Sequence, residues 1–317
     1  FKIIMSLTKV TYSMIAGEAI NVLDFGAVGD GVANDTAAIQ AAHDYSVANG
    51  FSHVVFPAGE YNFATLTWSP YVGAKTTGKV YLQTDNASGR TIQISDQYGR
   101  PIQYGVNSQT NPMWCGQFFL INTNNANTAT AWSFGGATNA YYCSLSYIQG
   151  IETRGFGGGV YEFRHNAFGL DFIECNALAN NGNHIIVDSS ATNVITATNF
   201  TSCRFGSSTG YLFDINSTHS NTFSIVSCEF VYLAGLIKPG NSSPLTTINI
   251  IGGNLEWSQV TAPYVSNNTG ATIVINGATV APSALSGWPT PVVSQTSGIS
   301  TTTFINIKYC LLYTSDA

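Results

Sequence analysis

The sequence predicts an all-β fold, a parallel β-helix (solenoid) that begins with a capping α-helix. Three observations predict it: a short pattern that repeats along the second half of the chain, β-branched strands bounded by turn residues, and one helical segment near the start. The repeated segments are SLSYIQGIE, GLDFIECNA, ATNFTSCRF, TFSIVSCEF, INIIGGNLE and TIVINGATV. Each has Gly or Cys at one equivalent place, and steps of 25, 28, 25, 25 and 24 residues separate Gly150, Cys175, Cys203, Cys228, Gly253 and Gly277. Self-similarity over about 20 to 50 residues is typical of stacked units that bury their apolar faces only against one another.

Alternation along each strand predicts which side chains enter the interior, because successive side chains point to opposite faces. We expect the interior to hold Ile173, Cys175 and Ala177 in one coil, Thr201, Cys203 and Phe205 in the next, and Val226, Cys228 and Phe230 in the third. We expect the outer face to carry Glu174, Asn176, Ser202, Arg204, Ser227 and Glu229. The three cysteines then form a column of small buried thiols, about 4.8 Å apart. The sequence has no CxxC or HxxxH spacing, so it predicts neither a metal site nor a cofactor.

Composition and charge argue against several classes of partner. Only 9% of the 317 residues are charged, so Asn, Ser, Thr and Gly must solvate most of the surface. The net charge is -6 and the 11 Lys and Arg residues are dispersed, which leaves no footprint for nucleic acid. There is no basic strip and no apolar run of about 20 residues, so we expect no membrane insertion. The first residues lack the apolar core and cleavage site of a secretory signal, so no signal peptide is predicted.

The segment from residue 21 to 61 predicts the start of the solenoid. We expect a strand over Asn21–Phe25, a Gly-Asp-Gly turn, a helix that begins near Asp35 or Thr36 and ends before Gly50, and a second strand over His53–Phe56. A helix in this place can cover the open edge of the first coil, which would otherwise be free to pair with another chain.

This segment resembles the N-terminal part of the pectate-lyase-like superfamily of right-handed parallel β-helices, and specifically of bacteriophage tailspike and tail-fibre proteins. The matching stretches are NVLDFGA (21–27), GDG (29–31), NDTAAIQ (34–40), FPAGEY (56–61) and, upstream, LTKVTYSMI (7–15). The resemblance implies a single-stranded right-handed solenoid in a phage tail protein, made in the host cytoplasm and located in the virion. It also implies a homotrimer that contacts other phage tail proteins and binds a bacterial surface polysaccharide. The polygalacturonase signatures NTD, DD, GHG and RIK do not appear at matching places.

We expect three regions along the chain. Residues 1–20 form an N-terminal arm for virion attachment or a linker, with Met5 as the native start. Residues 21–285 form the β-helix, which divides into the cap (21–61), irregular early coils (62–140) and regular coils (141–285). Residues 286–317 are a turn-rich tail whose last residues, KYCLLYTSDA, resemble translated adapter sequence, so we expect a different native C-terminus.

The candidate site lies on another strand of each coil. Aligning GNHIIVDSSATN with GYLFDINSTHSN places Ile185 and Val187 beside Phe213 and Ile215 on the interior face. The outer face would then carry His184, Ile186 and Asp188 in one coil and Leu212, Asp214 and Asn216 in the next. Asp188 and Asp214 would have Cα atoms about 8 Å apart. Inverting glycosidases hold their carboxyl groups about 6.5 to 9.5 Å apart, so Asp188 and Asp214 are candidates for a catalytic acid and base.

Neighbouring coils add further candidates, and Glu162 is a third catalytic carboxylate. The substrate-binding candidates are Arg164, His184, Lys238, Tyr161, Tyr211 and Trp257, of which the aromatic residues would stack on sugar rings. A second-choice strip on another sheet is Glu174, Arg204 and Glu229, which is also the composition of an ion-pair ladder. Asp188 and Asp214 can equally accept turn hydrogen bonds. His165 and His219 are expected at turns, with no serine in a nucleophile context beside them.

Two functional hypotheses follow. The first is a depolymerase, a glycoside hydrolase or polysaccharide lyase that cuts a bacterial surface polysaccharide with carboxylates on the outer wall. The second is a non-catalytic receptor-binding or structural tail module, in which the same wall only holds glycan or other tail proteins. A groove with facing carboxylates and an adjacent aromatic favours the enzyme, whereas a flat wall of Ser, Thr and Asn favours the binder.

Overall fold

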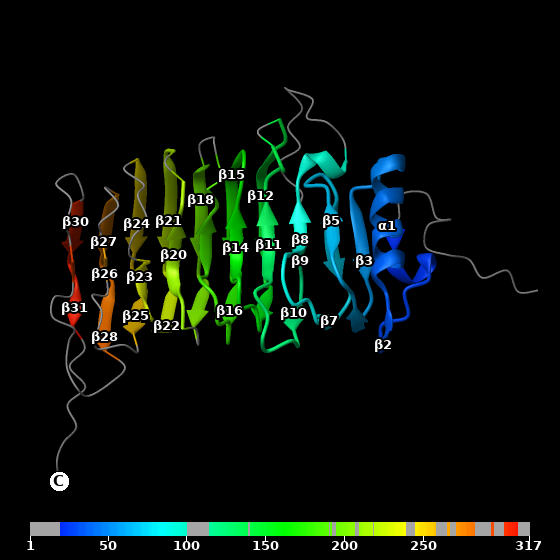
Figure 1. Cartoon of the computed structure of the whole chain (residues 1–317), viewed down its shortest axis with the longest axis horizontal. Coiled ribbons are helices and arrows are strands. Elements are labelled where there is room, and N and C mark those ends of the chain that lie inside the picture. Colours follow the sequence, from blue (N-terminus) through cyan, green and yellow to red (C-terminus); the bar gives the residue numbers. More distant parts are fainter. Residues whose placement is uncertain are drawn as a thin grey trace, which may run out of the picture.

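The fold is known from a computed structural model, which describes residues 20–99, 114–138, 140–189, 191, 195–206, 209–217, 219–238, 245–257, 265–266, 271–282, 293–294 and 301–309. These residues form an elongated solenoid with α1 at one end and β30 and β31 at the other (Figure 1). Every ladder between its strands is parallel, and each coil from β3 to β29 contributes one strand to each of three sheets. The all-β parallel β-helix predicted from the repeat is confirmed.

The three sheets are named A, B and C after their order in a coil. Within the described residues, sheet A has 11 strands: β1 (Ile20–Asn21), β3 (His53–Phe56), β6 (Gly73–Thr76), β9 (Trp114–Cys115), β12 (Cys143–Gln149), β15 (Ala167–Ile173), β18 (Ile195–Thr201), β21 (Asn221–Val226), β24 (Thr246–Ile251), β27 (Thr272–Asn276) and β30 (Thr301–Ile305). Sheet B, over the same part of the chain, also has 11: β2 (Asp30–Asn34), β4 (Gly59–Asn62), β7 (Val80–Thr84), β10 (Phe118–Asn122), β13 (Glu152–Arg154), β16 (Asn176–Leu178), β19 (Arg204–Gly206), β22 (Glu229–Leu233), β25 (Asn254–Trp257), β28 (Thr279–Pro282) and β31 (Lys308–Tyr309). Sheet C has nine that can be described: β5 (Leu66–Trp68), β8 (Arg90–Ile94), β11 (Thr130–Phe134), β14 (Gly159–Phe163), β17 (Ile185–Val187), β20 (Tyr211–Ile215), β23 (Gly235–Ile237), β26 (Val265–Ser266) and β29 (Val293–Ser294).

The helix α1 (Thr36–Asn49) covers the first coil, as the sequence predicts. Gly50 ends it in a left-handed conformation (φ 78°), which glycine adopts without strain. Asp35 precedes the helix, but its carboxylate accepts hydrogen bonds from the backbone N–H groups of Val28 (2.7 Å) and Gly29 (3.2 Å). Asp35 therefore fixes the preceding glycine turn rather than capping the helix with its side chain.

The strand expected over Asn21–Phe25 is mostly a short 3-10 helix, η2 (Val22–Phe25). The Asn21 side chain accepts a hydrogen bond from Leu23 N–H at 3.0 Å, and Gly26 (φ 97°) ends the turn. A second short 3-10 helix, η3 (Asp96–Tyr98), follows β8.

A column of left-handed residues joins sheet A to sheet B. In successive coils the positions with positive φ are Gly150, Glu174, Ser202, Ser227, Gly252, Gly277 and Asn306. The backbone N–H of each of the first six donates to the last strand residue of the next coil, for example Ser202 to Val226 at 3.0 Å. The chain therefore turns sharply between the two sheets at one left-handed residue in each of these coils, except that Gly252 is followed by a second, Gly253.

This turn corrects two expectations from the sequence. Strict alternation placed Ile173, Thr201 and Val226 inside, but these side chains point outward and the preceding column is buried instead: Phe172, Phe200 and Ile225. The left-handed residue interrupts the alternation. The side chain before it therefore points outward, although the cysteine after it points inward. The same register places Gly150 and Gly277 in the turn column and not in the cysteine column, where Ile151 and Ala278 lie.

The predicted cysteine column is confirmed. Cys175, Cys203 and Cys228 are buried in consecutive coils, and the backbone N–H of Cys203 lies 3.3 Å from Cys228 Sγ. None of the described cysteines forms a disulfide. Aromatic rings continue the interior stacking, with Phe172 and Phe200 at 4.5 Å and Phe205 and Phe230 at 5.6 Å between centroids. Strands also continue through β29, β30 and β31, within the stretch that the sequence assigns to a turn-rich tail.

Candidate functional site

Charged side chains collect on the outer face of sheet C. Ladder pairing places Glu162 beside Ile186 and Ile186 beside Asp214, while Phe163, Val187 and Ile215 point inward. Lys238 follows β23 in the next coil, and its backbone N–H donates to Phe213 O at 2.9 Å. We name this group the sheet C site; its members are Arg90, Glu162, Asp188, Asp214 and Lys238.

Arg90 holds Glu162 at one end of the sheet C site. The guanidinium makes a two-pronged ion pair with the Glu162 carboxylate, in which Nη2 lies 2.8 Å from Oε1 and Nε contacts Oε2. Ser133 Oγ donates a further hydrogen bond to Oε2 at 2.7 Å. The hydrogen bond to Glu162 is the main reason that the pKa of Arg90 is raised. Glu162 is therefore an anchored charge whose side chain is only 8% exposed.

Asp214 is held in a similar way at the other end. Its Oδ2 accepts hydrogen bonds from Lys238 Nζ (2.8 Å) and Asn183 Nδ2 (2.7 Å), and Asn216 Nδ2 donates to Oδ1 at 3.1 Å. The Asp214 side chain is 8% exposed, whereas that of Lys238 is 44% exposed. The ammonium group therefore bridges a nearly buried carboxylate and solvent.

Asp188 lies on the coil between these two pairs. Its side chain is 25% exposed, more than either neighbouring carboxylate, and its Oδ2 is 3.5 Å from Arg90 Nη2. Its backbone N–H donates to Phe163 O, which stacks Asp188 beside Arg164 of the preceding coil. Arg164 Nε is buried and has no hydrogen-bond partner among the described residues.

His165 also belongs to this neighbourhood, although the sequence assigned it only to a turn. Burial lowers its pKa, Arg164 lowers it further, and Asp188 acts in the opposite direction. These three side chains therefore share one electrostatic environment. Arg90, Ser133 and Asn183 were also missed, because they come from turns or from coils far away in the sequence.

Two predicted substrate-binding residues lie inside the solenoid. Tyr161 is 1% exposed and packs against Phe172 and Phe200, so it cannot stack on a sugar ring. Alternation already indicates this, because Tyr161 neighbours the outward Glu162. His184 is fully buried with its ring 5.5 Å from that of Phe205. Strict alternation places His184 on the outer face, but β17 begins only at Ile185, so the rule does not extend to this residue.

The remaining predicted residues are dispersed. Tyr211 is partly exposed at the start of β20, and its backbone N–H donates to Asn183 Oδ1 at 2.8 Å. The side chain of Trp257 lies outside the described residues. On sheet B, Arg204 Nε is 2.8 Å from Glu229 Oε2, and both side chains are about half exposed. Arg204 is in register with Asn176 and Glu229, whereas Glu174 occupies the left-handed turn.

The structure thus defines a parallel β-helix whose outer wall carries a compact group of charged side chains on one sheet. The family described as rhamnogalacturonase A/epimerase, pectate lyase-like matches residues 19–230, more than half of the 317 residues, and the chain belongs to this family. Mannuronan C5-epimerase AlgE6 of Azotobacter vinelandii is 58% identical over 77 residues, which are 24% of this chain and 9% of that protein. AlgE5 of the same organism is 66% identical over 41 residues, 13% of this chain and 4% of that protein. The matches therefore span only a small part of these relatives.

Solved structures share the fold at low sequence identity. The enzymatically active domain of tailspike protein 4 from bacteriophage CBA120 matches with a TM-score of 0.65 and 14% identity, covering 91% of this chain and 39% of that one. The Dettilon tailspike protein matches with a TM-score of 0.56 and 13% identity over 92% of this chain and 62% of that one. The AlgE6 A-module of Azotobacter vinelandii matches with a TM-score of 0.50 and 16% identity over 92% of this chain and 95% of that one. Among the described residues, no helix is long and apolar enough to cross a membrane.

Proposed function

We propose that the chain belongs to a phage tail protein that binds a bacterial surface polysaccharide along sheet C and depolymerises it at the sheet C site. Membership of the pectate-lyase-like family and the fold shared with two tailspike structures support this proposal. The observation that carries it is the arrangement of three carboxylates on consecutive coils. Glu162 and Asp214 are each neutralised by their own cation, and Asp188 lies between them with the greatest exposure.

Asp188 is the residue that transfers the proton in this proposal. Glu162 and Asp214 keep their positions through several hydrogen bonds each, so they shape the site and set its potential. The ladder places Val187 beside Ile215, so Asp214 lies one coil and two residues away from Asp188. Their Cα atoms are therefore about 8 Å apart, a separation that allows an acid and a base to work on opposite sides of a glycosidic bond.

Cations beside Asp188 would bind the substrate. Arg164 Nε is a buried donor without a partner among the described residues, and a buried donor of this kind is rare unless a ligand or water satisfies it. Lys238 reaches solvent, and Tyr211 is partly exposed on the preceding coil, in register with Gly235. An acidic sugar would meet both cations, which would also stabilise the charge that builds up when a proton next to its carboxylate is removed.

Hydrolysis and elimination differ in their products, so one experiment separates them. The protein is incubated with a panel of purified capsular and lipopolysaccharide glycans, and new reducing ends and the absorbance of an unsaturated sugar are both followed. Asp188→Asn should lower product release by at least about a hundredfold, the usual contribution of a positioned acid or base. Asp171→Asn is the matched control, because Asp171 is an exposed carboxylate on sheet A that hydrogen-bonds Asn199. An equal loss of product release in both variants, or no loss in Asp188→Asn, contradicts the proposal that Asp188 transfers the proton.

The alternative is a non-catalytic receptor-binding or structural tail module. The multiple hydrogen bonds of Glu162 and Asp214 favour it, because fully engaged carboxylates are typical of a structural network. Retention of a glycan without any product would identify this function. We also propose a homotrimer within the virion, which sedimentation equilibrium on the purified chain tests directly.

A further inference from the structure

Sheet B carries an aromatic platform on its outer face. Tyr81 and Phe119 lie directly opposite each other on β7 and β10, with ring centroids 5.0 Å apart and an angle of 22° between the ring planes. Both side chains are partly exposed, because their neighbours Val80, Leu82, Phe118 and Leu120 fill the interior. Ile121, also partly exposed, extends the apolar surface along β10. Ordinary exposed strand positions carry polar side chains, so a stacked aromatic pair here calls for a role.

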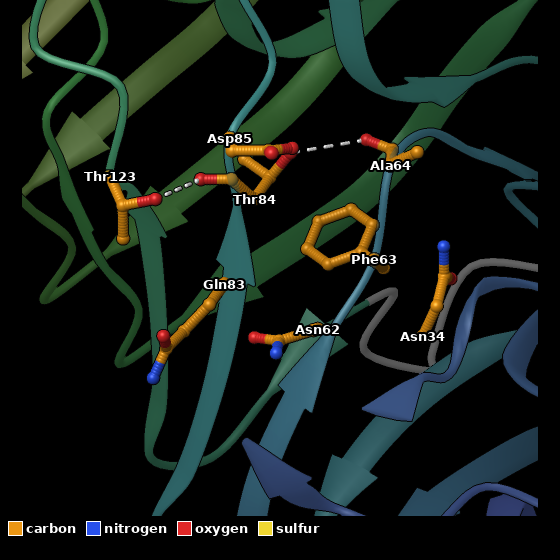
Figure 2. Close-up of a pocket in the computed structure, with 8 residues that line it drawn as sticks. All are labelled: Asn34, Asn62, Phe63, Ala64, Gln83, Thr84, Asp85 and Thr123. Carbon is orange, nitrogen blue, oxygen red and sulfur yellow. Dashed lines mark hydrogen bonds between the residues drawn. The ribbon is translucent and has the colours of Figure 1, made fainter. Parts of the chain in front are cut away.

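A polar pocket of about 330 Å³ begins where this platform ends. It is lined by Asn34, Asn62, Phe63, Ala64, Gln83, Thr84, Asp85 and Thr123 (Figure 2). Gln83 connects the two features, since it lies two residues after Tyr81 on the same face of β7, about 6.6 Å away. The pocket volume lies at the small end of the range for ligand pockets.

Hydrogen bonds hold the pocket in shape. Thr123 Oγ1 donates to Thr84 O at 3.1 Å, Thr84 Oγ1 donates to Ala64 O at 3.4 Å, and Asn62 Nδ2 donates to Gly31 O at 2.5 Å. Phe63 is 3% exposed and lies in the middle of these groups, where it forms an apolar floor. Phe63 is too buried to stack on a sugar, so the pocket offers amides and hydroxyls to the polar edge of a sugar ring, and stacking falls to Tyr81 and Phe119.

The charges around the platform select the kind of saccharide. Glu60 and Glu152 lie at the two ends of the Tyr81–Phe119 column, and Arg154 is paired with Glu152. Asp85 adds a further exposed carboxylate at the pocket. Exposed Lys79 lies two residues before Tyr81, so with Arg154 the surface has two cations against three carboxylates. The net charge is slightly negative, and the surface therefore favours a neutral sugar over an acidic one, in contrast to the sheet C site with its exposed Lys238.

We propose that the platform and the pocket together form a second, non-catalytic binding site for a neutral oligosaccharide. The site lies on sheet B next to the cap, and it goes beyond the depolymerase proposed for sheet C. A glycan chain would stack on Tyr81 and Phe119 and place one sugar in the polar pocket. The two sites would then recognise different glycans or different parts of one glycan.

Titration with neutral hexasaccharides (malto-, cello-, manno- and chito-oligosaccharides) tests the proposal, with hexagalacturonate as the acidic comparison. At least one neutral probe should bind the wild-type chain more tightly than the acidic probe does. The double variant Tyr81→Ala/Phe119→Ala should weaken that binding at least about tenfold, which corresponds to about 1.4 kcal/mol. Gln83→Ala, which leaves the aromatic pair in place, should weaken it too. Tyr232→Ala is the control, because Tyr232 is half exposed on β22 of the same sheet, several coils away.

Three results would overturn the proposal. The first is that none of the neutral probes binds. The second is that binding survives in both the platform and the pocket variants, whose circular dichroism matches that of the wild type. The third is that the double variant changes the oligomeric state in sedimentation, which would identify the platform as an interface between chains. Asp188→Asn separates this site from the sheet C site. This variant should leave the binding of the neutral probes unchanged even if it abolishes polysaccharide cleavage. The outcome of the cleavage assay therefore does not affect the test of the sheet B site.

Discussion

Replacing Arg90 with methionine should destabilise the solenoid by about 1 to 3 kcal/mol. The change removes two hydrogen bonds to a carboxylate that is 8% exposed, and each bond to a charged group contributes about 1.5 to 3 kcal/mol. Breaking a fully buried pair costs about 3 to 5 kcal/mol. The Arg90 side chain is 32% exposed, so water can reach part of the space it leaves, and Ser133 still donates to Glu162. The expected cost is therefore below the value for a fully buried pair.

Equilibrium urea denaturation measures this cost, and Arg204→Met provides a matched control. Arg204 Nε makes an ion-pair contact with Glu229 Oε2 at 2.8 Å, but those side chains are 48% and 43% exposed. Exposed pairs contribute about 0 to 1 kcal/mol, so Arg204→Met should shift the midpoint much less than Arg90→Met. The double variant Arg90→Met/Glu162→Gln should be more stable than the sum of the two single effects implies, because no unpaired charge remains.

A cost for Arg90→Met equal to that of Arg204→Met would refute the reasoning. So would strict additivity in the double variant, since it would mean that the two side chains do not stabilise each other. In either case Glu162 would be solvated in the folded protein, and its treatment as an anchored charge at the sheet C site would be wrong.

Two further predictions concern positions where the backbone or a buried group is strained. Ser202→Gly should raise the urea midpoint by an amount equivalent to about 0.5 to 1 kcal/mol, because Ser202 has a φ of 53° that glycine adopts freely; an unchanged midpoint would show that the turn is unstrained. His184→Leu should stabilise the protein, most strongly in acid. Burial lowers the pKa of His184 to about 3, so below about pH 6.5 the unfolded chain binds a proton that the folded chain excludes, and stability falls as the pH falls. The advantage of His184→Leu should therefore grow by about 1.4 kcal/mol per pH unit between pH 6 and pH 4, and a constant advantage would contradict the buried, neutral histidine.

The repeat and the N-terminal segment were sufficient to predict the architecture. Cys175, Cys203 and Cys228 occur at equivalent places in successive segments, and equivalent places in a stacked coil must share one environment. The faces of the preceding strand were not predictable by the same rule. Glu174, Ser202 and Ser227 adopt left-handed conformations that residues of these types rarely adopt, and no sequence signal marks them.

The site was predictable only where the strand was regular. Glu162 and Asp214 lie on β14 and β20 and were assigned correctly to the outer face. Arg90 lies 72 residues before Glu162, so only the stacking of coils brings them together. Its coil belongs to the irregular early part of the chain, where the sequence has no repeat from which a register could be derived.

The distribution of charge around Asp188 supports the role that we propose for it. A carboxylate flanked by two unpaired carboxylates would resist ionisation, because like charges about 5 to 8 Å apart disfavour the charged form. Here the preceding coil pairs Glu162 with Arg90, and the following coil pairs Asp214 with Lys238, so each neighbour contributes little net charge. Asp188 itself contacts Arg90 at 3.5 Å, lies beside Arg164 and His165, and is the most exposed of the three carboxylates. An approaching substrate would reach Asp188 more readily than either anchored carboxylate, and a proton-transferring group requires such access to the substrate.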